Sequence, residues 1–468
     1  MSYFAKRLGW VAAAVVGAAS GHTHAADPVV VSIDTDVRHQ TIDGFGASGC
    51  WTPNWFSGIS TENQDRALDL LFTEAGANLT IYRHNLPSAA GDDVIMRPRR
   101  SANVETAPFE YDITRDADNI ALLRRVVTRG VDDVVLFAIS PPQRLTRNGK
   151  TSGGDGGGSN LREGAEADFA RYLADVSLLT MDTVGLDSAR LSPVNEPNWL
   201  WGEHDERRWQ EGCHYSPEEV RRVGRAVLAE LGSRDETDRL HLDLFDAGSW
   251  ASTPEYAQII WSDPVLAEAL DAISIHSYWS GAAEKQRTRA WLDEHMPGVK
   301  VVMSEFCEMR AGHDPTMQSG LVVAQTMHED FTIGRVTEWT WWLGLSRSQY
   351  CDGLVHCWLD RDEIETTKRL WVIAQWSRSV KPGWSRVDIT SSSDDVMASA
   401  FASPDGSSSV CVIVNPSDTP REVQARLSEG GAISAAWVTD DQRDLARLDW
   451  AGVVPPRSVV TLEFDASK

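Results

Sequence analysis

Two patterns of hydrophobic and polar positions alternate along the chain between about residues 40 and 380. Short apolar runs predict strands, and longer segments with apolar residues about every 3.6 positions predict helices that bury one face. The predicted strands end near Gly46, Arg83, Ser140, Asn195, Asp246, His276, Glu305 and Trp341. The predicted helices cover residues 62–74, 116–129, 163–181, 217–231, 283–295, 317–331 and 366–380. This alternation favours a closed parallel sheet, so we expect an α/β fold of the (β/α)8 barrel type.

The pattern changes after residue 380, where no long helical segment follows. Short β-type runs occupy residues 387–389, 396–401, 410–414, 422–425, 433–438 and 459–464. Turn-forming clusters such as Ser403-Pro404-Asp405-Gly406 separate them, which predicts a small antiparallel β-sandwich. We therefore expect a barrel domain over residues 27–380 and a sandwich domain over 381–468. An early apolar run at residues 29–33 adds a strand either to the barrel or to the sandwich.

The first 26 residues differ from the rest of the chain. Lys6 and Arg7 precede a largely apolar stretch at residues 8–19, and Thr23-His24-Ala25-Ala26 offers small residues for cleavage. These features predict a secretory signal peptide cut after Ala25 or Ala26, with a disordered tag as the alternative. The apolar stretch is too short to span a bilayer, and no later run reaches about 20 apolar residues. We expect a secreted protein, extracellular or periplasmic, without integral membrane association.

The strongly negative net charge of the chain limits the classes of molecule that it can bind. The chain has 44 basic and 68 acidic residues, a formal charge of −24. Residues 1–26 contain two basic and no acidic residues, so the remaining chain carries −26. Such a chain repels phosphate backbones and anionic lipid surfaces, which argues against nucleic-acid and membrane partners. A neutral ligand fits this charge, although charge alone does not identify one.

The six cysteines are few for a chain of 468 residues: Cys50, Cys213, Cys307, Cys351, Cys357 and Cys411. They do not form a disulfide scaffold, and no CxxC pair indicates a zinc site. Cys351 and Cys357 are close enough in sequence for us to predict a bridge that closes one loop in an oxidising compartment. The sequence does not decide whether the other four cysteines are buried free thiols.

Two glutamates follow predicted strands that stand on opposing sides of the barrel mouth. The fourth strand leads into Asn195-Glu196-Pro197, and the seventh ends in Ser304-Glu305-Phe306. Catalytic groups of such barrels lie at the carboxyl ends of strands. Two facing carboxylates are what glycosidic bond cleavage requires, because one protonates the leaving oxygen while the other attacks the anomeric carbon. Either glutamate alone could be a solvated loop carboxylate, whereas the pair favours a glycosidase.

A set of motifs also carries a resemblance to a known family. The motifs are Ile42-Asp43-Gly44-Phe45-Gly46, Ser140-Pro141-Pro142, Val194-Asn195-Glu196-Pro197, Ser304-Glu305-Phe306 and Gln375-Trp376-Ser377-Arg378. Together they resemble glycoside hydrolase family 30, from about residue 38 to the C-terminus. The resemblance implies a retaining β-glycosidase with a barrel and an attached β-sandwich. It also implies that Glu196 is the acid/base and Glu305 the nucleophile. Where the family usually has a sugar-lining tryptophan after Ser-Pro-Pro, this chain has Arg144, which puts one wall of the sugar site in doubt.

Further residues at the strand ends suit supporting roles. Asn195 can bond the sugar 2-hydroxyl, with a turn-forming asparagine as the alternative. Arg83 can hold Glu305 ionised, unless it is a surface arginine. His276 and Tyr278 follow the sixth strand, where the tyrosine can orient the nucleophile and the histidine could equally belong to the core. We expect Glu338, in the eighth strand, to be structural.

Several of the nineteen tryptophans fall in loops at the barrel mouth, where indole rings can stack on sugar faces. These are Trp51 and Trp55 after the first strand, Trp199, Trp201 and Trp209 after the fourth, and Trp341 and Trp342 at the eighth. We expect Trp51, Trp199 and Trp342 to bind substrate. Trp371, Trp376 and Trp384 belong to the last helix and the domain junction, so we expect them to serve packing.

The resulting hypothesis is a secreted retaining β-glycosidase that needs no metal or organic cofactor and acts on β-linked polysaccharide. The segments at residues 195–201 and 209–213 resemble the β-1,6-galactanase branch of the family, which implies arabinogalactan side chains as substrate. The alternatives within the family are β-1,6-glucanase, β-glucuronidase and xylanase activity. A catalytically silent carbohydrate-binding protein is a rival that the presence of both glutamates disfavours. A structural cell-surface module, the other rival, predicts no cleft.

Overall fold

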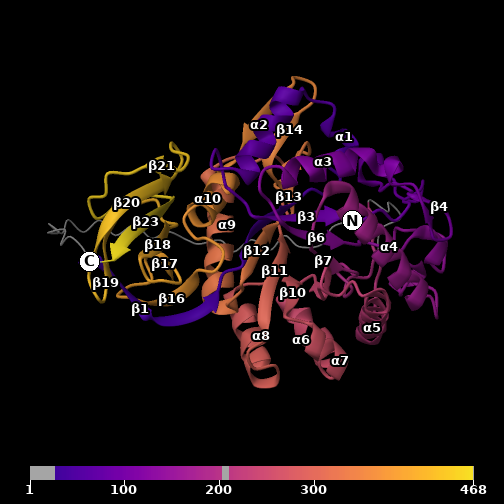
Figure 1. Ribbon diagram of the computed structural model, residues 1–468. Coiled ribbons are helices and arrows are strands. Elements are labelled where there is room, and N and C mark those ends of the chain that lie inside the picture. The colour runs from indigo at the N-terminus through magenta and orange to yellow at the C-terminus, as the bar shows by residue number, and fades with distance from the viewer. Residues whose placement is uncertain (1–26, 203–209, 467–468) are drawn as a thin grey trace, which may run out of the picture.

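A computed structural model describes residues 27–202 and 210–466 (Figure 1). The predicted signal peptide and Trp209 lie outside the described residues. A parallel sheet forms the centre of the barrel. Seven barrel strands are continuous: β2 (Gly44–Ser48), β3 (Ile81–Asn85), β6 (Asp133–Phe137), β7 (Ala189–Ser192), β10 (Ala272–His276), β11 (Lys300–Phe306) and β12 (Glu338–Trp341). The fifth barrel strand is in two pieces, since β8 (Leu240–Leu242) pairs with β7 and β9 (Phe245–Ala247) pairs with β10. Only two residues separate these pieces and β12 pairs with β2, so the barrel closes and the predicted fold is confirmed.

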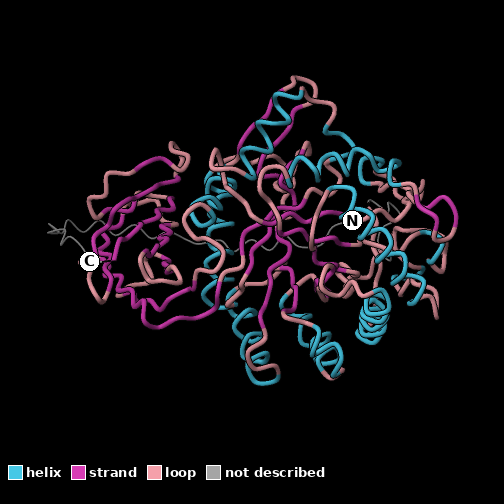
Figure 2. The backbone as a smooth tube through the Cα atoms, viewed as in Figure 1, coloured by secondary structure: helices cyan, strands magenta, loops and turns pink. Residues whose placement is uncertain are grey.

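The barrel helices lie outside the strands (Figure 2). Their bounds are α2 (Thr61–Phe72), α3 (Ala117–Val127), α4 (Glu166–Val184), α5 (Pro217–Arg234), α8 (Ala282–His295), α9 (Met317–Glu329) and α10 (Lys368–Ser377). Local signals set their ends: Ser216 and Glu219 form a capping box at the start of α5, and Gly185 with φ 82° ends α4. The structure adds α1 (Pro53–Phe56), α6 (Thr253–Trp261) and α7 (Pro264–Ala269), which are too short to display a helical period. None of the described helices is both long and apolar enough to cross a membrane.

An insertion after the last barrel strand was not predicted. It contains β13 (Leu343–Ser346), β14 (Gly353–Trp358) and β15 (Glu363–Thr366), which form a three-stranded sheet before α10. The predicted bridge between Cys351 and Cys357 is wrong, because all six cysteines are free. Cys357 lies within the extended strand β14 and Cys351 precedes it. At about 3.3 Å per residue, their Cα atoms are far beyond the roughly 7 Å that a disulfide spans.

The sandwich sheet is built from both ends of the described chain. Its main strands are β1 (Val29–Thr41), β16 (Ser385–Ser391), β17 (Met397–Ala402), β18 (Ser408–Asn415), β19 (Arg421–Leu427), β20 (Gly431–Thr439) and β23 (Ser458–Ala466), with short edge strands β21 (Ala446–Arg447) and β22 (Val453–Val454). Strand β1 pairs antiparallel with β16 and parallel with β19, so it joins the sandwich and not the barrel. Val29, Val31 and Ile33 alternate with less buried residues and pack in the sandwich core.

Helices α9 and α10 join the barrel to the sandwich. The Trp376 indole on α10 donates to the Ser399 hydroxyl at 3.3 Å, and Gln375 donates to Thr439 at 2.8 Å. Phe331, just after α9, contacts Phe401 edge-on with ring centroids 5.7 Å apart. One continuous hydrophobic cluster therefore runs from the barrel into the near face of the sandwich. The sandwich supports the last barrel helices, away from the carboxyl ends of the barrel strands.

Candidate active site

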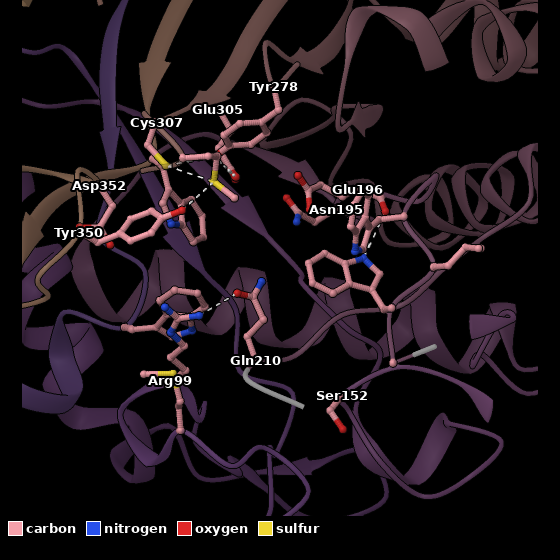
Figure 3. A pocket seen from close by; sticks show the side chains of 18 of the residues that line it. Arg99, Ser152, Asn195, Glu196, Gln210, Tyr278, Glu305, Cys307, Tyr350 and Asp352 are labelled. Atoms are coloured by element: carbon pink, nitrogen blue, oxygen red, sulfur yellow. Dashed lines mark hydrogen bonds between the residues drawn. The ribbon is translucent and has the colours of Figure 1, made fainter. Parts of the chain in front are cut away.

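A cavity of about 730 Å³ opens at the carboxyl ends of the barrel strands (Figure 3). Seven of the residues proposed from the sequence line it: Trp51, Asn195, Glu196, Trp199, Tyr278, Glu305 and Trp342. Arg83 and His276 do not line the cavity, because both are almost completely buried beneath it. The sequence pattern therefore located the residues of one site, and the structure divides them into a lining and a supporting layer.

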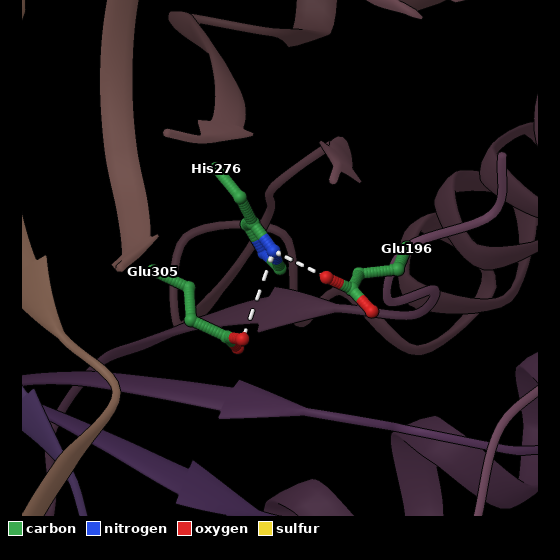
Figure 4. Close-up of side chains that lie close together, drawn as sticks. All are labelled: Glu196, His276 and Glu305. Atoms are coloured by element: carbon green, nitrogen blue, oxygen red, sulfur yellow. Dashed lines mark hydrogen bonds and ion pairs between the residues drawn. The ribbon is translucent and has the colours of Figure 1, made fainter. Parts of the chain in front are cut away.

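The two glutamates approach each other across the cavity. Glu305 is the penultimate residue of β11, and Glu196 lies in the loop that follows β7. Their carboxylates and the His276 imidazole each offer an atom within 4.8 Å of the others. Nδ1 of His276 lies 3.3 Å from Oε1 of Glu196 and 3.7 Å from Oε1 of Glu305 (Figure 4). The imidazole thus lies between the two carboxylates.

Arg83 and Tyr278 fix the Glu305 carboxylate. The Arg83 guanidinium donates to Oε2 of Glu305 and packs 3.8 Å above the centre of the Phe137 ring. The Tyr278 hydroxyl donates to the other oxygen, Oε1, at 3.0 Å. Arg83 also donates to Oδ1 of Asn195 at 2.7 Å, which leaves the Asn195 amino group as the donor for a ligand. Glu305 is held in one orientation, and Asn195 is oriented for a sugar hydroxyl.

Charges in this cluster are strongly coupled. Burial raises the pKa of Glu305, while His276 and Arg83 oppose that rise by favouring the carboxylate. Burial alone would lower the pKa of His276, but the carboxylates of Glu305, Asp246 and Glu196 raise it to about 9. His276 is therefore a cation at neutral pH. Two buried basic side chains, His276 and Arg83, therefore face the carboxyl groups of this cluster.

Asp246 completes the cluster and was not among the residues proposed from the sequence. Its carboxylate lies 3.0 Å from Nη2 of Arg83 and 3.6 Å from Nε2 of His276, and it accepts from the hydroxyls of Ser192 and Ser304. Burial would raise the pKa of Asp246, but Arg83 and His276 hold it well below its usual range. The sequence did contain a signal for Asp246, because this residue ends a predicted strand. A polar residue at that position points to the mouth of the barrel.

Asp246→Asn is expected to lower the pKa of His276 from about 9, because the change removes a negative charge beside Nε2. Asparagine tolerates the left-handed backbone at this position, where φ is 49°. The raised pKa of His276 stabilises the fold below its usual value of 6.5, and this stability is lost as pH rises through about 9. In the variant the loss should occur at lower pH. NMR titration of the imidazole and melting temperatures from pH 6 to 10 measure both effects.

His84 is an internal reference for that titration. Burial lowers its pKa to about 3, so its imidazole should stay neutral in both proteins over the same pH range. A His276 resonance that titrated at the same pH with and without the Asp246 carboxylate would contradict the proposed coupling.

Tryptophans line both sides of the cavity. Trp51 and Trp342 are 8% and 9% exposed and meet edge to face, with ring centroids 5.2 Å apart. Trp199 is 45% exposed and stacks on Trp279, a residue that was not predicted from the sequence. Trp201 also lines the cavity, and its indole donates to the Glu196 carbonyl at 3.3 Å. The described part of the cavity therefore has a buried aromatic wall and an exposed aromatic rim.

Arg144, which stands where the family usually has a sugar-lining tryptophan, does not line the cavity. It lies in a short 3-10 turn (Gln143–Leu145), where it pairs with Glu105 at 2.6 Å and stacks on Phe109. Among the described residues, the cationic side chain that lines the cavity is Arg99, which packs 4.5 Å above Trp51. A hairpin inserted at residues 105–111 supplies both partners of Arg144 and turns its side chain away from the sugar site.

The other buried carboxylate considered from the sequence, Glu338, lies at the start of β12 and outside the cavity. Nη1 of Arg190 lies 2.8 Å from its carboxylate. This arrangement agrees with the structural role expected for Glu338.

Glu196, His276 and Glu305 form the one group of potential metal ligands found among the described residues. The group is poorly suited to a cation. Arg83 already occupies one oxygen of Glu305, and His276 carries its own positive charge at neutral pH. We therefore assign no metal to this site.

Comparisons with known proteins agree with this architecture. The model of O-Glycosyl hydrolase family 30 matches residues 28–356, and that of the Glycosyl hydrolase family 30 β-sandwich domain matches residues 385–462. A curated relative, Glucuronoxylanase XynC of Bacillus subtilis (strain 168), is 22% identical over 312 residues. That match covers 65% of this chain and 64% of the relative, so the chain spans less than two thirds of its length.

Solved structures with the same fold include three informative neighbours. A conserved exported protein from Bacteroides fragilis has a TM-score of 0.81 at 23% identity, covering 93% of this chain and 100% of its own. The catalytic domain of GH30 xylanase C from Talaromyces cellulolyticus has a TM-score of 0.75 at 20% identity, with coverage of 93% and 100%. The endo-beta1,6-glucanase BT3312 has a TM-score of 0.69 at 16% identity and covers 94% of each chain. At these identities the likeness establishes the fold.

Proposed function

Because the chain belongs to glycoside hydrolase family 30, we propose that it is a retaining β-glycosidase with Glu305 as nucleophile and Glu196 as acid/base. The observation that supports this most directly is the separation of the two carboxylates, which offer oxygens within 4.8 Å of each other. Retaining enzymes hold their carboxyl groups about 5–5.5 Å apart, whereas inverting enzymes leave about 6.5–9.5 Å for a water molecule. The spacing favours direct attack by a carboxylate.

The reaction proceeds by double displacement. The Glu305 carboxylate attacks the anomeric carbon as the bond to the leaving oxygen breaks, and Glu196 donates its proton to that oxygen. Glu196, now a carboxylate, then takes a proton from water, and the water oxygen displaces Glu305 from the anomeric carbon. Arg83 and His276 stabilise the charge on Glu305 before attack and after release. No step requires a metal or an organic cofactor.

The first-formed product is expected to keep the β configuration, because two displacements at one carbon restore the original stereochemistry. Proton NMR of the anomeric signals during the first minutes of hydrolysis measures this. The α anomer appearing first would contradict the retaining mechanism. Lack of turnover on every β-glycoside would instead favour a carbohydrate-binding protein without catalysis.

The substrate within this mechanism is β-1,6-galactan, as found in arabinogalactan side chains. Support comes from the loop after β7, whose sequence through Cys213 resembles the galactanase branch, and from a chain whose charge suits a neutral polymer. Two polar side chains in the cavity, Arg99 and Asp352, are available to bond an axial 4-hydroxyl. Secretion directed by residues 1–26 belongs to the same proposal. The xylanase and β-1,6-glucanase neighbours make xylan and β-1,6-glucan the alternatives.

A direct comparison of sugar series tests the substrate. We expect kcat/KM on β-1,6-galacto-oligosaccharides to exceed that on the β-1,6-gluco series by about two orders of magnitude or more. A site built to bond a hydroxyl discriminates strongly against an epimer that leaves its polar groups unpaired. Equal or better cleavage of the gluco series would identify a β-1,6-glucanase and leave the catalytic pair unchanged.

A further inference from the structure

Two stacked indole rings form an exposed rim on the cavity. Trp199 and Trp279 lie with ring centroids 5.2 Å apart and ring planes 13° from parallel. They are 45% and 61% exposed, although large apolar side chains on a protein surface are usually covered. Both line the cavity, as does the exposed Leu200. The Trp279 ring also lies 5.6 Å from the Tyr278 ring, yet both indoles keep a large exposed surface at the cavity.

The backbone of Trp279 adds a second unusual feature. Its φ is 51°, in the left-handed region that large side chains rarely adopt. Within the same site, Trp51, Glu196 and Asp246 also have positive φ, so strained backbone gathers around the cavity. Residues in such conformations persist where the surrounding structure holds them and cluster at functional sites. The exposure of Trp279 and its strained backbone together indicate a role in binding.

The position of the stacked pair identifies the part of a substrate that it faces. The amide of Trp199 donates to the Glu196 carbonyl at 3.0 Å, which places Trp199 beside the acid/base, and Trp279 stacks on it from the loop after Tyr278. The amide of Trp342, in the buried wall, instead donates to the carbonyl of Phe306, the residue after the nucleophile. Glu305 must contact the sugar that is attacked, and Glu196 must contact the oxygen that departs. The cavity therefore has a wall beside the attacked sugar and a rim beside the leaving group.

We propose that the exposed surfaces of Trp199 and Trp279 bind the pyranose ring of the leaving group, forming a subsite for the sugar released by Glu196. The inference rests on the proposed glycosidase function. A neutral β-linked pyranose has C–H faces that pack on indole, and such contacts bury apolar area without needing charge. The same subsite holds the acceptor sugar when a second sugar, instead of water, displaces Glu305. A site of this kind favours cleavage within a chain, because it binds sugar beyond the broken bond.

The test compares two substrates with the same attacked sugars but different leaving groups. In a disaccharide β-fluoride the leaving group is a fluoride ion, which needs no leaving-group subsite. In the matching tetrasaccharide the leaving group is a sugar, which does. We expect Trp279→Gly, which suits the left-handed backbone, to lower kcat/KM for the tetrasaccharide about tenfold or more and to change it less than about twofold for the fluoride. Trp279→Phe should recover most of the loss. The fraction of intermediate transferred to added acceptor sugar should fall in parallel.

Trp291→Ala is the matched control, because this indole stacks on His295 of α8 and lies outside the cavity lining. It should leave both substrates unchanged at temperatures where the variant is folded. Equal losses on the tetrasaccharide and the fluoride in Trp279→Gly would overturn the inference, and so would no loss on either. If the wild-type protein turned over neither substrate in any sugar series, the proposed function itself would fail. That result differs from failure of the subsite alone.

Discussion

Glu305→Gln should lower kcat by at least about three orders of magnitude, because an amide cannot form the covalent intermediate. The substitution keeps the shape of the side chain, and its carbonyl oxygen can still accept from Tyr278 or Arg83. Asn195 and Asp246 continue to bind Arg83, so the guanidinium is not left without a partner. The variant should therefore fold. Steady-state rates on an activated aryl β-glycoside, with circular dichroism as a check on folding, measure the effect.

Glu338→Gln provides the matched control. It makes the same chemical change at a buried glutamate on the neighbouring strand β12, where the partner is Arg190. We expect this variant to lose stability and to keep its activity while it is folded, since Glu338 does not line the cavity. If Glu305→Gln retained more than about a tenth of the wild-type kcat, Glu305 would not be the nucleophile.

Glu196→Ala should separate substrates by their leaving groups. Removing general acid catalysis costs about 10²–10⁴-fold when the departing oxygen needs a proton, and far less when it leaves as dinitrophenolate. The change also opens space beside Nδ1 of His276, which lay 3.3 Å from the lost carboxylate. A small anion such as azide is expected to bind there, attracted by the imidazolium. It should attack the intermediate to give a β-glycosyl azide, raising turnover of the dinitrophenyl glycoside.

Azide should not rescue Glu305→Gln, which forms no intermediate to attack, so that variant is the control for the azide effect. Product analysis by NMR identifies the azide and its configuration. An equal loss on dinitrophenyl and unactivated substrates, without any azide effect, would assign Glu196 a role other than acid/base.

The barrel could be predicted because its strands and helices have different periods, and because several predicted strands, such as those ending at Asn195 and Glu305, pass from apolar to polar residues at their ends. Elements without such a signal were missed. Helices α6 and α7 are only nine and six residues long. The sheet β13–β15 interrupts the last strand–helix unit, so its runs were assigned to no barrel strand. The disulfide prediction relied on sequence spacing, which does not reveal that the intervening residues are extended.

Within the site, most residues at predicted strand ends and in the loops directly after them were located from the sequence, whereas Asp246 and Trp279 were missed and Arg144 was misplaced. Glu305, Arg83 and His276 belong to strands whose ends the pattern located. His276 was expected either in the core or in the site, and it satisfies both descriptions, since it is fully buried and contacts the carboxylates. Arg144 was placed by its offset from a motif, but an inserted hairpin redirects it. Trp279 was missed because its importance depends on stacking with a distant loop.

The pairing of β1 in the sandwich has a consequence for the order in which the chain can fold. The Val30 amide bonds to the Ser392 hydroxyl, 362 positions later in the sequence, and β1 lies between β16 and β19. Strand β1 is therefore synthesised long before the two strands with which it pairs. Contacts of such long sequence separation slow folding, because a large loop must close before they form. Until then, β16 and β19 have unpaired edges, which other chains can pair with. A chain that stops before β16 and β19 lacks both partners of β1 and cannot complete the sandwich sheet.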